Sequence, residues 1–195
     1  ALSVKWCTVL IKRRGMSEDS RLEQWVKASI STAKFDAFMM PNIQGLGRLD
    51  INLILEDRKL IDSFDKSRND LEANMALTDH VTTSYLWVLG AYEAVRTMAQ
   101  RIHENKDLVS EGVRQEFVRV KKAFNRVRVP LAKMEPAGAH KKTDSHIAYP
   151  GFDFEAGVAW RVSEDTIITR RYLSDQLLGL LEQQRSEQIR RSNDT

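Results

Sequence analysis

The chain has 195 residues, of which 42% are hydrophobic and 29% charged, a balance typical of a folded domain that excludes overall disorder. The net charge of +3 is too small to name a partner, and the single cysteine, Cys7, excludes an internal disulfide and a multi-cysteine metal cluster. No apolar run approaches the roughly 20 residues of a membrane span. We therefore expect a cytoplasmic protein with no membrane association.

The chain divides by composition into three parts. Residues 1–15 are an uncertain N-terminal extension, residues 16–182 a single helical domain, and residues 183–195 a polar C-terminal tail. The extension contains VKWCTVLIK, which is rich in residues that favour strands. Two interpretations stay open: it is an edge strand that pairs with a hairpin near the C-terminus, or it is dispensable and the domain folds from Met16.

The first two predicted helices follow from caps and apolar spacing. Ser20 and Glu23 form a capping box, and the helix behind them runs to about Phe38. Its expected buried residues are Leu22, Trp25, Val26, Ile30, Ala33 and Ala37, and Pro41, Gly45 and Gly47 are expected to end it. A second helix is predicted from Arg48 to about Asn74, with Glu56, Asp57, Arg58 and Lys59 among the residues of its solvated face.

The most apolar stretch is Thr83–His103, which predicts a central helix capped by Thr78 or Asp79. Its apolar residues alternate in steps of four and three, which indicates a continuous packing seam: Val81, Tyr85, Val88, Tyr92, Val95, Ala99 and Ile102. A neighbouring stripe becomes polar at Glu93, Arg96, Gln100 and His103. We expect this polar half-face to carry any chemistry.

A fourth helix is predicted from Ser110 to about Val129, ended or kinked by Pro130. Its apolar residues again repeat in steps of four and three, which favours antiparallel packing against the central helix: Val113, Phe117, Val120, Phe124 and Val127.

The remaining elements are a turn-rich surface loop at 136–151, a β-hairpin at 157–170 and a last helix from Ser174. The hairpin follows from the period-two alternation of Val158, Trp160 and Val162. The expected fold class is therefore mainly α, a multi-helix bundle with a β-hairpin before the C-terminal helix.

Arg96 and His103 are seven positions apart, so they lie on one helix face about 10 Å apart along the axis. This R-x6-H spacing resembles the signature of HEPN domains, helical bundles found in RNA-cleaving toxins and defence proteins. The resemblance implies that Arg96 holds a phosphate and that His103 acts as an acid or base at the ribose hydroxyl, in a cleft formed by two subunits. Glu93 and Gln100 are candidate helpers on the same stripe. The alternative is that Arg96 pairs with Glu93 one turn earlier and His103 lies at an exposed helix end.

The segment from Arg114 to Lys142 is strongly basic, with nine Lys and Arg against two Glu, a local net charge of +7. The total is +3, so the rest of the chain carries −4. Such a surface is suited to the phosphate backbone of a nucleic acid, whereas a solvated face that balances acidic helices elsewhere is the alternative. Because Phe117 and Phe124 belong to the seam, we expect contacts to the backbone and not to bases. The candidate binding residues are Arg114, Arg119, Lys121, Lys122, Arg126, Arg128, Lys141 and Lys142.

No metal or cofactor site is expected. His140, Asp144 and His146 lie in the turn-rich loop without a spacing that fixes a metal, and the sequence has no Walker-type phosphate loop, G-x-G-x-x-G or H-E-x-x-H motif. Three functions stay open. The chain is a helical binding or interaction module that contacts itself or another protein, a metal-independent ribonuclease of the HEPN type, or a sequence-tolerant nucleic-acid-binding protein.

Overall fold

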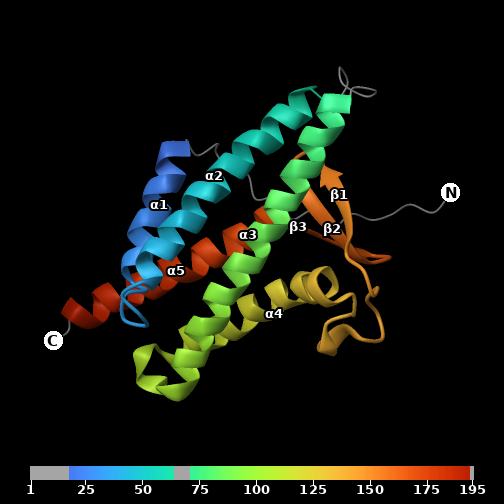
Figure 1. Cartoon of the computed structure of the whole chain (residues 1–195). Helices are drawn as coiled ribbons and strands as arrows, with labels where there is room; N and C mark the ends of the chain where they lie inside the picture. The colour runs from blue at the N-terminus through green and yellow to red at the C-terminus, as the bar shows by residue number, and fades with distance from the viewer. Residues whose placement is uncertain (1–17, 64–70, 194–195) are drawn as a thin grey trace.

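The computed structural model describes residues 18–63 and 71–193, and there the chain is mainly helical with a small antiparallel sheet before the last helix, as predicted (Figure 1). The predictions for residues 1–15, including Cys7, lie outside the described residues. The long helices within these ranges are α1 (Glu18–Ile30), α2 (Met39–Ser63), α3 (Leu71–Glu104), α4 (Glu111–Lys133) and α5 (Arg170–Asn193). None of these helices combines the length and the apolar character that crossing a bilayer requires.

The centre of the fold is α3, which crosses the molecule, while α4 runs back beside it (Figure 1). The predicted seam of α3 is confirmed, since Val88 and Val95 are completely buried and Tyr92 nearly so. The seam of α4 is confirmed as well, and its Phe124 ring lies 6.2 Å from the ring of Trp87 on α3. α4 therefore packs its seam against α3 in one core cluster.

The predicted end of the first helix is wrong. α1 stops at Ile30, residues 31–38 form turns, and α2 begins at Met39. Pro41 starts a helix instead of ending one, because the amides of a helix's first turn have no carbonyl partner and proline lacks only that amide. Ser20 lies inside α1 and not at a cap.

The predicted buried face of this first segment is also largely wrong. Trp25 is buried, but Val26 and Ile30 are 39% and 56% exposed, Leu22 is half-buried, and Ala33 and Ala37 are exposed. The buried face follows Arg21, Trp25, Ala28, Ser29 and Thr32, so polar side chains occupy more than half of it. Because the prediction considered only apolar residues, it assigned the wrong face of the helix to the core.

α2 and α3 both begin earlier than predicted. Residues 64–70 lie outside the described part, and Leu71, which falls within the predicted second helix, is an exposed residue at the start of α3. Thr78 does not cap α3, because its hydroxyl donates a hydrogen bond to the carbonyl of Asn74 within the helix. Within a helix, the hydroxyl of a serine or threonine can donate to the carbonyl four residues earlier instead of capping the helix start.

α4 begins where predicted. The hydroxyl of its N-cap, Ser110, accepts a hydrogen bond from the amide of Val113, and a carboxylate of Glu187 on α5 accepts from the amide of Ser110. The helix continues past Pro130 to Lys133, so the proline does not end it. A short 3-10 helix, η1 (Lys106–Leu108), connects α3 and α4.

The hairpin is confirmed as β2 (Gly157–Ser163) and β3 (Thr166–Thr169), and a third strand, β1 (Tyr149–Asp153), pairs with β2 in the order β1-β2-β3. β1 was missed because Pro150 and Gly151 mark a turn in sequence, although proline is tolerated in an edge strand. A second 3-10 helix, η2 (Gly138–His140), interrupts the preceding loop.

The sheet and α5 complete the core. Val158, Trp160 and Val162 of β2 face the helices and are buried. α5 begins at Arg170, four residues before the predicted Ser174, and it continues to Asn193 through the polar C-terminal tail, where Gln184 is 1% exposed and donates to the carbonyl of Ser31. The part of the tail that the structure describes is therefore a continuation of α5.

Candidate functional site

A basic groove of about 570 Å³ lies between α3 and α4 and is named here the α3/α4 groove. Its apolar lining includes Tyr92, Ile102, Phe117 and Val118, and its basic residues are Arg96, His103, Arg114, Lys121 and Lys122. Residues from both predicted sites, the R-x6-H pair and the basic segment, therefore line the same hollow.

Helical spacing explains why these side chains converge. Residues three, four and seven positions apart lie on one helix face. Arg96, Gln100 and His103 share a face of α3, and Arg114, Val118 and Lys121 share a face of α4. Because the two helices run in opposite directions along their buried seams, these faces border the same groove.

Arg96 is held by Glu93, which was the alternative interpretation of the motif. Its Nε donates to the Oε2 of Glu93 at 2.6 Å, and both side chains are about half exposed. Glu93 does not line the α3/α4 groove; its other oxygen lies 3.9 Å from a terminal nitrogen of Arg128, whose guanidinium lies over the ring of Tyr92. Glu93 can therefore orient Arg96, through a hydrogen bond that uses the Nε of the guanidinium.

The charges of the α4 side differ in how far they are neutralised. Arg114 pairs with Glu111 one turn earlier. Lys121 is half-buried and Lys122 exposed, and within residues 18–63 and 71–193 no carboxylate pairs with either. These two lysines therefore supply the unneutralised charge of the groove.

The other predicted nucleic-acid-binding residues do not line this groove. Arg119 makes three hydrogen bonds to Glu116, two of them from its Nε at 2.8 and 2.9 Å, so its side chain is already paired. Lys141 and Lys142 are exposed in the turn after η2.

Arg126 has a structural contact. Its guanidinium donates to both oxygens of Asp144 at 2.8 and 2.9 Å, which fastens α4 to the loop before β1. Burial raises the pKa of Asp144, but the hydrogen bonds from Arg126 and Thr143 outweigh it and leave the pKa below its usual range. In the described residues, no three His, Cys, Asp or Glu side chains are grouped to hold a metal ion.

The sequence prediction missed a buried ionic cluster. Arg170 is completely buried and donates to Asp50 at 2.6 Å and to Asp57 at 2.8 Å. Arg21 donates to Asp50 at 2.8 Å, and the Nε2 of His80 lies 2.7 Å from Asp57. The cluster joins α1, α2, α3 and α5 through side chains that are each no more than 7% exposed.

This cluster corrects the prediction that Asp57 belongs to a solvated face. A signal for it was present in the sequence, since Ile43, Gly47, Asp50, Ile54 and Asp57 follow one another in steps of four and three on one stripe of α2. Charged residues at core positions of an apolar stripe indicate buried ion pairs. The cluster lines none of the described hollows, so we assign it to the stability of the fold.

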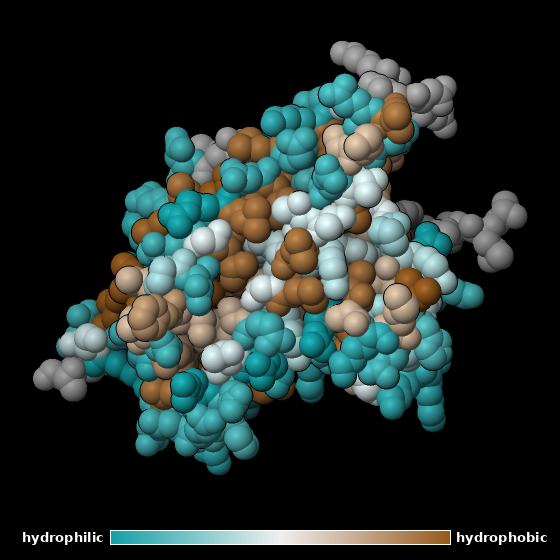
Figure 2. Space-filling view, in the orientation of Figure 1, coloured by the Kyte–Doolittle hydropathy of each residue, from teal (hydrophilic) through white to brown (hydrophobic). Residues whose placement is uncertain are grey.

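A second hollow, of about 460 Å³, lies between α2 and α3 and is mainly apolar, with Met39, Leu46, Leu49 and Ala94 in its lining. Figure 2 shows hydrophobic residues gathered on this side of the molecule, over α2 and α3, with hydrophilic residues around them. If the chain is a protein-interaction module, as one of the sequence-based hypotheses has it, this apolar surface is the candidate contact site.

Comparisons of the chain with protein-family models, with curated proteins and with solved structures found no match.

Proposed function

We propose that the protein binds nucleic acid without sequence preference and that the phosphate backbone lies in the α3/α4 groove. The observation that carries this proposal is the convergence of Arg96, His103, Arg114, Lys121 and Lys122 from two helices on one hollow. Phosphate groups attract Lys and Arg whatever the base sequence of the nucleic acid, because the contact involves only the sugar-phosphate backbone.

The partners of these side chains support the assignment. Lys121 and Lys122 have no carboxylate partner in the described part of the chain, so binding a phosphate breaks no ion pair of theirs. Arg96 uses only its Nε for Glu93, which leaves its terminal N–H groups as donors for a phosphate. The proposal makes the basic segment a binding surface, in place of a solvated face.

Binding is tested by fluorescence anisotropy of a labelled single-stranded RNA over a range of salt concentrations. If Arg96, Arg114, Lys121 and Lys122 each neutralise a phosphate, the logarithm of affinity falls against the logarithm of salt with a slope of about −3. Replacing both lysines, Lys121→Gln with Lys122→Gln, reduces the slope to roughly −1.4.

The matched control removes the same charge elsewhere. Lys27→Gln with Lys59→Gln takes two positive charges from α1 and α2, which do not line the groove. We expect the control to bind almost as tightly as the wild type. Equal losses in the two double variants, or binding that does not depend on salt, contradict a phosphate site in the groove.

A second candidate function is metal-independent cleavage of RNA, and the specific observation that favours it is that Arg96 and His103 line the same groove with only Gln100 of their stripe between them. In this reaction the ribose 2′-hydroxyl attacks the neighbouring phosphorus and the bond to the 5′-oxygen breaks, which gives a 2′,3′-cyclic phosphate and a 5′-hydroxyl whose proton comes from water. His103 takes the proton of the hydroxyl, and Arg96 stabilises the charge on the phosphate. Glu93 is then a positioning residue for Arg96.

Cleavage is measured on single-stranded RNA in the presence of a metal chelator. The ribonuclease candidate requires that His103→Ala abolishes cleavage while binding persists, because a nearby lysine pair still holds the backbone. Cleavage that survives in His103→Ala, or no cleavage by the wild type, rejects this candidate and leaves the binding proposal standing.

A further inference from the structure

A hollow of about 480 Å³ lies between α4, η2, β3 and the start of α5 and is named here the α4/β3 hollow. Its lining combines the basic side chains of Lys122, Arg126 and His140 with hydroxyl groups and with apolar surface. Among the described residues that line it, none is acidic. A hollow with cations and hydroxyl donors but no carboxylate is suited to an anion.

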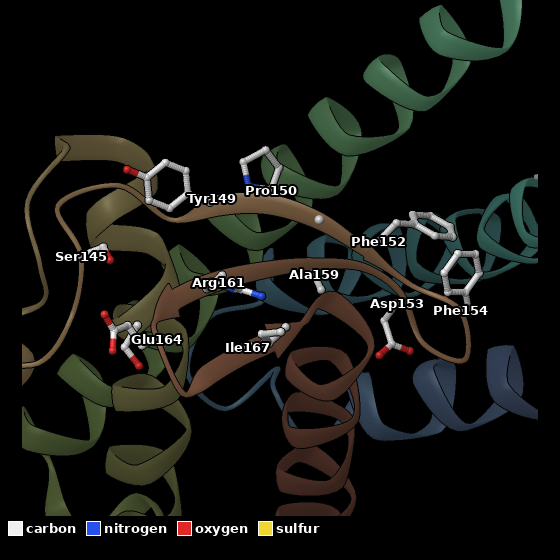
Figure 3. Close-up of a pocket in the computed structure, with 12 residues that line it drawn as sticks. Ser145, Tyr149, Pro150, Phe152, Asp153, Phe154, Ala159, Arg161, Glu164 and Ile167 are labelled. Carbon is white, nitrogen blue, oxygen red and sulfur yellow. The ribbon is translucent and has the colours of Figure 1, made fainter. Parts of the chain in front are cut away.

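The neighbouring hollow over the outer face of the sheet, of about 680 Å³, has a different lining. Figure 3 shows the carboxylates of Asp153 and Glu164 there, together with Arg161. Carboxylates repel an anion. Of the two hollows that Ile167 of β3 lines, the α4/β3 hollow is therefore the one that favours a phosphate.

Arg126 is held in place at the wall of the α4/β3 hollow. Its Nε and Nη2 donate to Asp144 at 2.8 and 2.9 Å, and Nη2 also donates to the hydroxyl of Thr166 on β3 at 3.3 Å. Asp144 is buried and is not one of the lining residues. A guanidinium carries five N–H groups, and the two on Nη1 take part in none of these three bonds. Arg126 is therefore oriented before a ligand binds and still has donors to offer.

Two further basic side chains complete the cationic wall. Lys122 lies four residues before Arg126, so the two share one face of α4. Lys122 is exposed, and no carboxylate pairs with it in the part of the chain that the structure describes. His140 lies in η2 and is half-buried, and its carbonyl accepts from the amides of Thr143 and Asp144 at 3.1 and 2.9 Å. The donors of this hollow thus come from α4, η2 and β3.

The rest of the lining offers apolar surface and the beginning of a helix. Ile167 and Tyr172 are 47% and 44% exposed, so an apolar or aromatic group of a ligand can cover them. Thr169, directly before α5, accepts with its hydroxyl from the amide of Tyr172 at 3.0 Å. The positive end of the α5 dipole therefore lies at this hollow and adds to its attraction for an anion.

We infer that the α4/β3 hollow binds the terminal phosphate of a nucleotide, with the phosphate at Lys122, Arg126 and His140 and the nucleoside against Tyr172 and Ile167. A phosphate monoester carries a charge of about −1.5 to −2 at pH 7 and three acceptor oxygens, which suits donors from three elements. The volume of about 480 Å³ falls within the range of roughly 300–1,000 Å³ of small-molecule sites, so the hollow holds more than a phosphate alone.

The nucleotide is either free or the first residue of a strand, and both carry the same phosphate monoester. The free nucleotide makes the inference independent of the proposed function, because its binding needs no contact in the α3/α4 groove. Lys122 lines both sites, so residues that line only one of them separate the two proposals: His140 for the α4/β3 hollow and Lys121 for the α3/α4 groove.

The first experiment measures binding of adenosine 5′-monophosphate to the full chain by isothermal titration calorimetry. Adenosine, which lacks the phosphate, should bind the wild type at least about tenfold more weakly. His140→Ala should weaken binding of the monophosphate roughly tenfold, and it keeps the backbone carbonyl that holds the turn. Lys141→Gln is the control at the adjacent position, because Lys141 is exposed and does not line the hollow, and it should bind as the wild type does.

A second pair of variants tests the aromatic wall. Tyr172→Ala should weaken binding of adenosine 5′-monophosphate roughly fivefold to a hundredfold, because it removes the ring on which the base stacks. Inorganic phosphate has no base, so its weaker binding should not change in this variant. Tyr172→Phe keeps the ring and should bind the monophosphate as the wild type does.

The source of the nucleotide is identified with oligouridine that carries either a 5′-phosphate or a 5′-hydroxyl. If the end of a strand occupies the hollow, the 5′-phosphate strengthens binding and His140→Ala removes this gain. Lys121→Gln should weaken both strands equally, because Lys121 lines only the α3/α4 groove. If the 5′-phosphate adds nothing while adenosine 5′-monophosphate binds, the ligand is a free nucleotide.

The outcomes separate the two proposals. If neither the monophosphate nor the 5′-phosphorylated strand binds more tightly than its unphosphorylated counterpart, the inference is wrong; this comparison uses the wild type and depends on no variant. Equal losses in His140→Ala and Lys141→Gln, with thermal melts showing both folded, overturn it as well. Binding of the monophosphate by a chain that does not bind RNA keeps this inference and overturns the proposed function.

Discussion

Replacing Asp57 by asparagine tests whether the buried ionic cluster stabilises the fold. The Oδ1 atom of Asp57 lies 2.7 Å from His80 and 3.2 Å from the amide of Val158, and Oδ2 accepts from Arg170 at 2.8 Å. Asparagine keeps the shape but places an N–H group against one of these donors and removes the charge. Loss of one partner from a buried ion pair costs about 3–5 kcal/mol. Because Arg170 keeps its second partner, Asp50, we expect the lower end, about 3 kcal/mol.

In a chain of this size 1 kcal/mol corresponds to about 2–4 °C of melting temperature, so Asp57→Asn should lower Tm by roughly 6–12 °C. The assay is thermal unfolding followed by circular dichroism. Glu56→Gln is the matched control on the same helix, since Glu56 pairs with Lys59 at 3.2 Å on the surface, where such a pair contributes less than about 1 kcal/mol. If Asp57→Asn lowers Tm no more than Glu56→Gln does, the cluster is not a stabilising element and the reasoning fails.

The remaining predictions concern a glycine contact and acid stability. In Gly47→Ala the new Cβ lies 2.5 Å from the Trp25 ring, so this variant should unfold at lower temperature than wild type, whereas Gly45→Ala, which meets nothing within 4 Å, should be neutral or stabilised by up to about 1 kcal/mol in urea unfolding. Burial raises the pKa values of Asp50 and Asp57, but the charges of Arg21 and Arg170 at Asp50, and the hydrogen bond from His80 with the charge of Arg170 at Asp57, outweigh it, so both pKa values lie below the usual range. A carboxylate whose pKa is lower in the folded than in the unfolded state stabilises the fold at pH values above the unfolded-state pKa. This stabilisation is lost as pH falls from the unfolded-state pKa through the folded-state pKa, so the free energy of unfolding should drop below about pH 4. The stability difference between wild type and Asp57→Asn should shrink over that interval, and a difference that stays constant from pH 7 to about pH 3 contradicts this assignment.

The candidate site was partly predictable because both halves of it lie on regular helices. The spacing of Arg96 and His103 placed them on one face of α3, and the spacing of Phe117 and Phe124 placed the basic residues of α4 outside the core. Spacing within each helix could not show which basic residues meet the α3 face. That choice depends on the rotation of α4 about its own axis and on contacts such as the one between Arg126 and Asp144.

The hollow of about 680 Å³ over the outer face of the sheet was beyond prediction from local patterns. Its floor needs Gly151 and Ala159 to lie opposite each other, and this pairing depends on a strand that the sequence marks as a turn. Tyr149 and Phe154 lie in a stretch without helical or strand periodicity, so nothing local indicated that they frame one hollow.

The amino-acid sequence by itself determined the helical class, the two apolar seams that join α3 to α4, and the hairpin before the last helix, because each depends on the period of side chains along one element. Tertiary structure decided where α1 ends, why Pro41 begins a helix, and that Asp50, Asp57 and Arg170 lie in the core. A charged residue is buried only when a partner from a distant segment neutralises it, and 120 positions separate Asp50 from Arg170. The two members of such a pair are too far apart along the chain for any local sequence pattern to indicate that they meet.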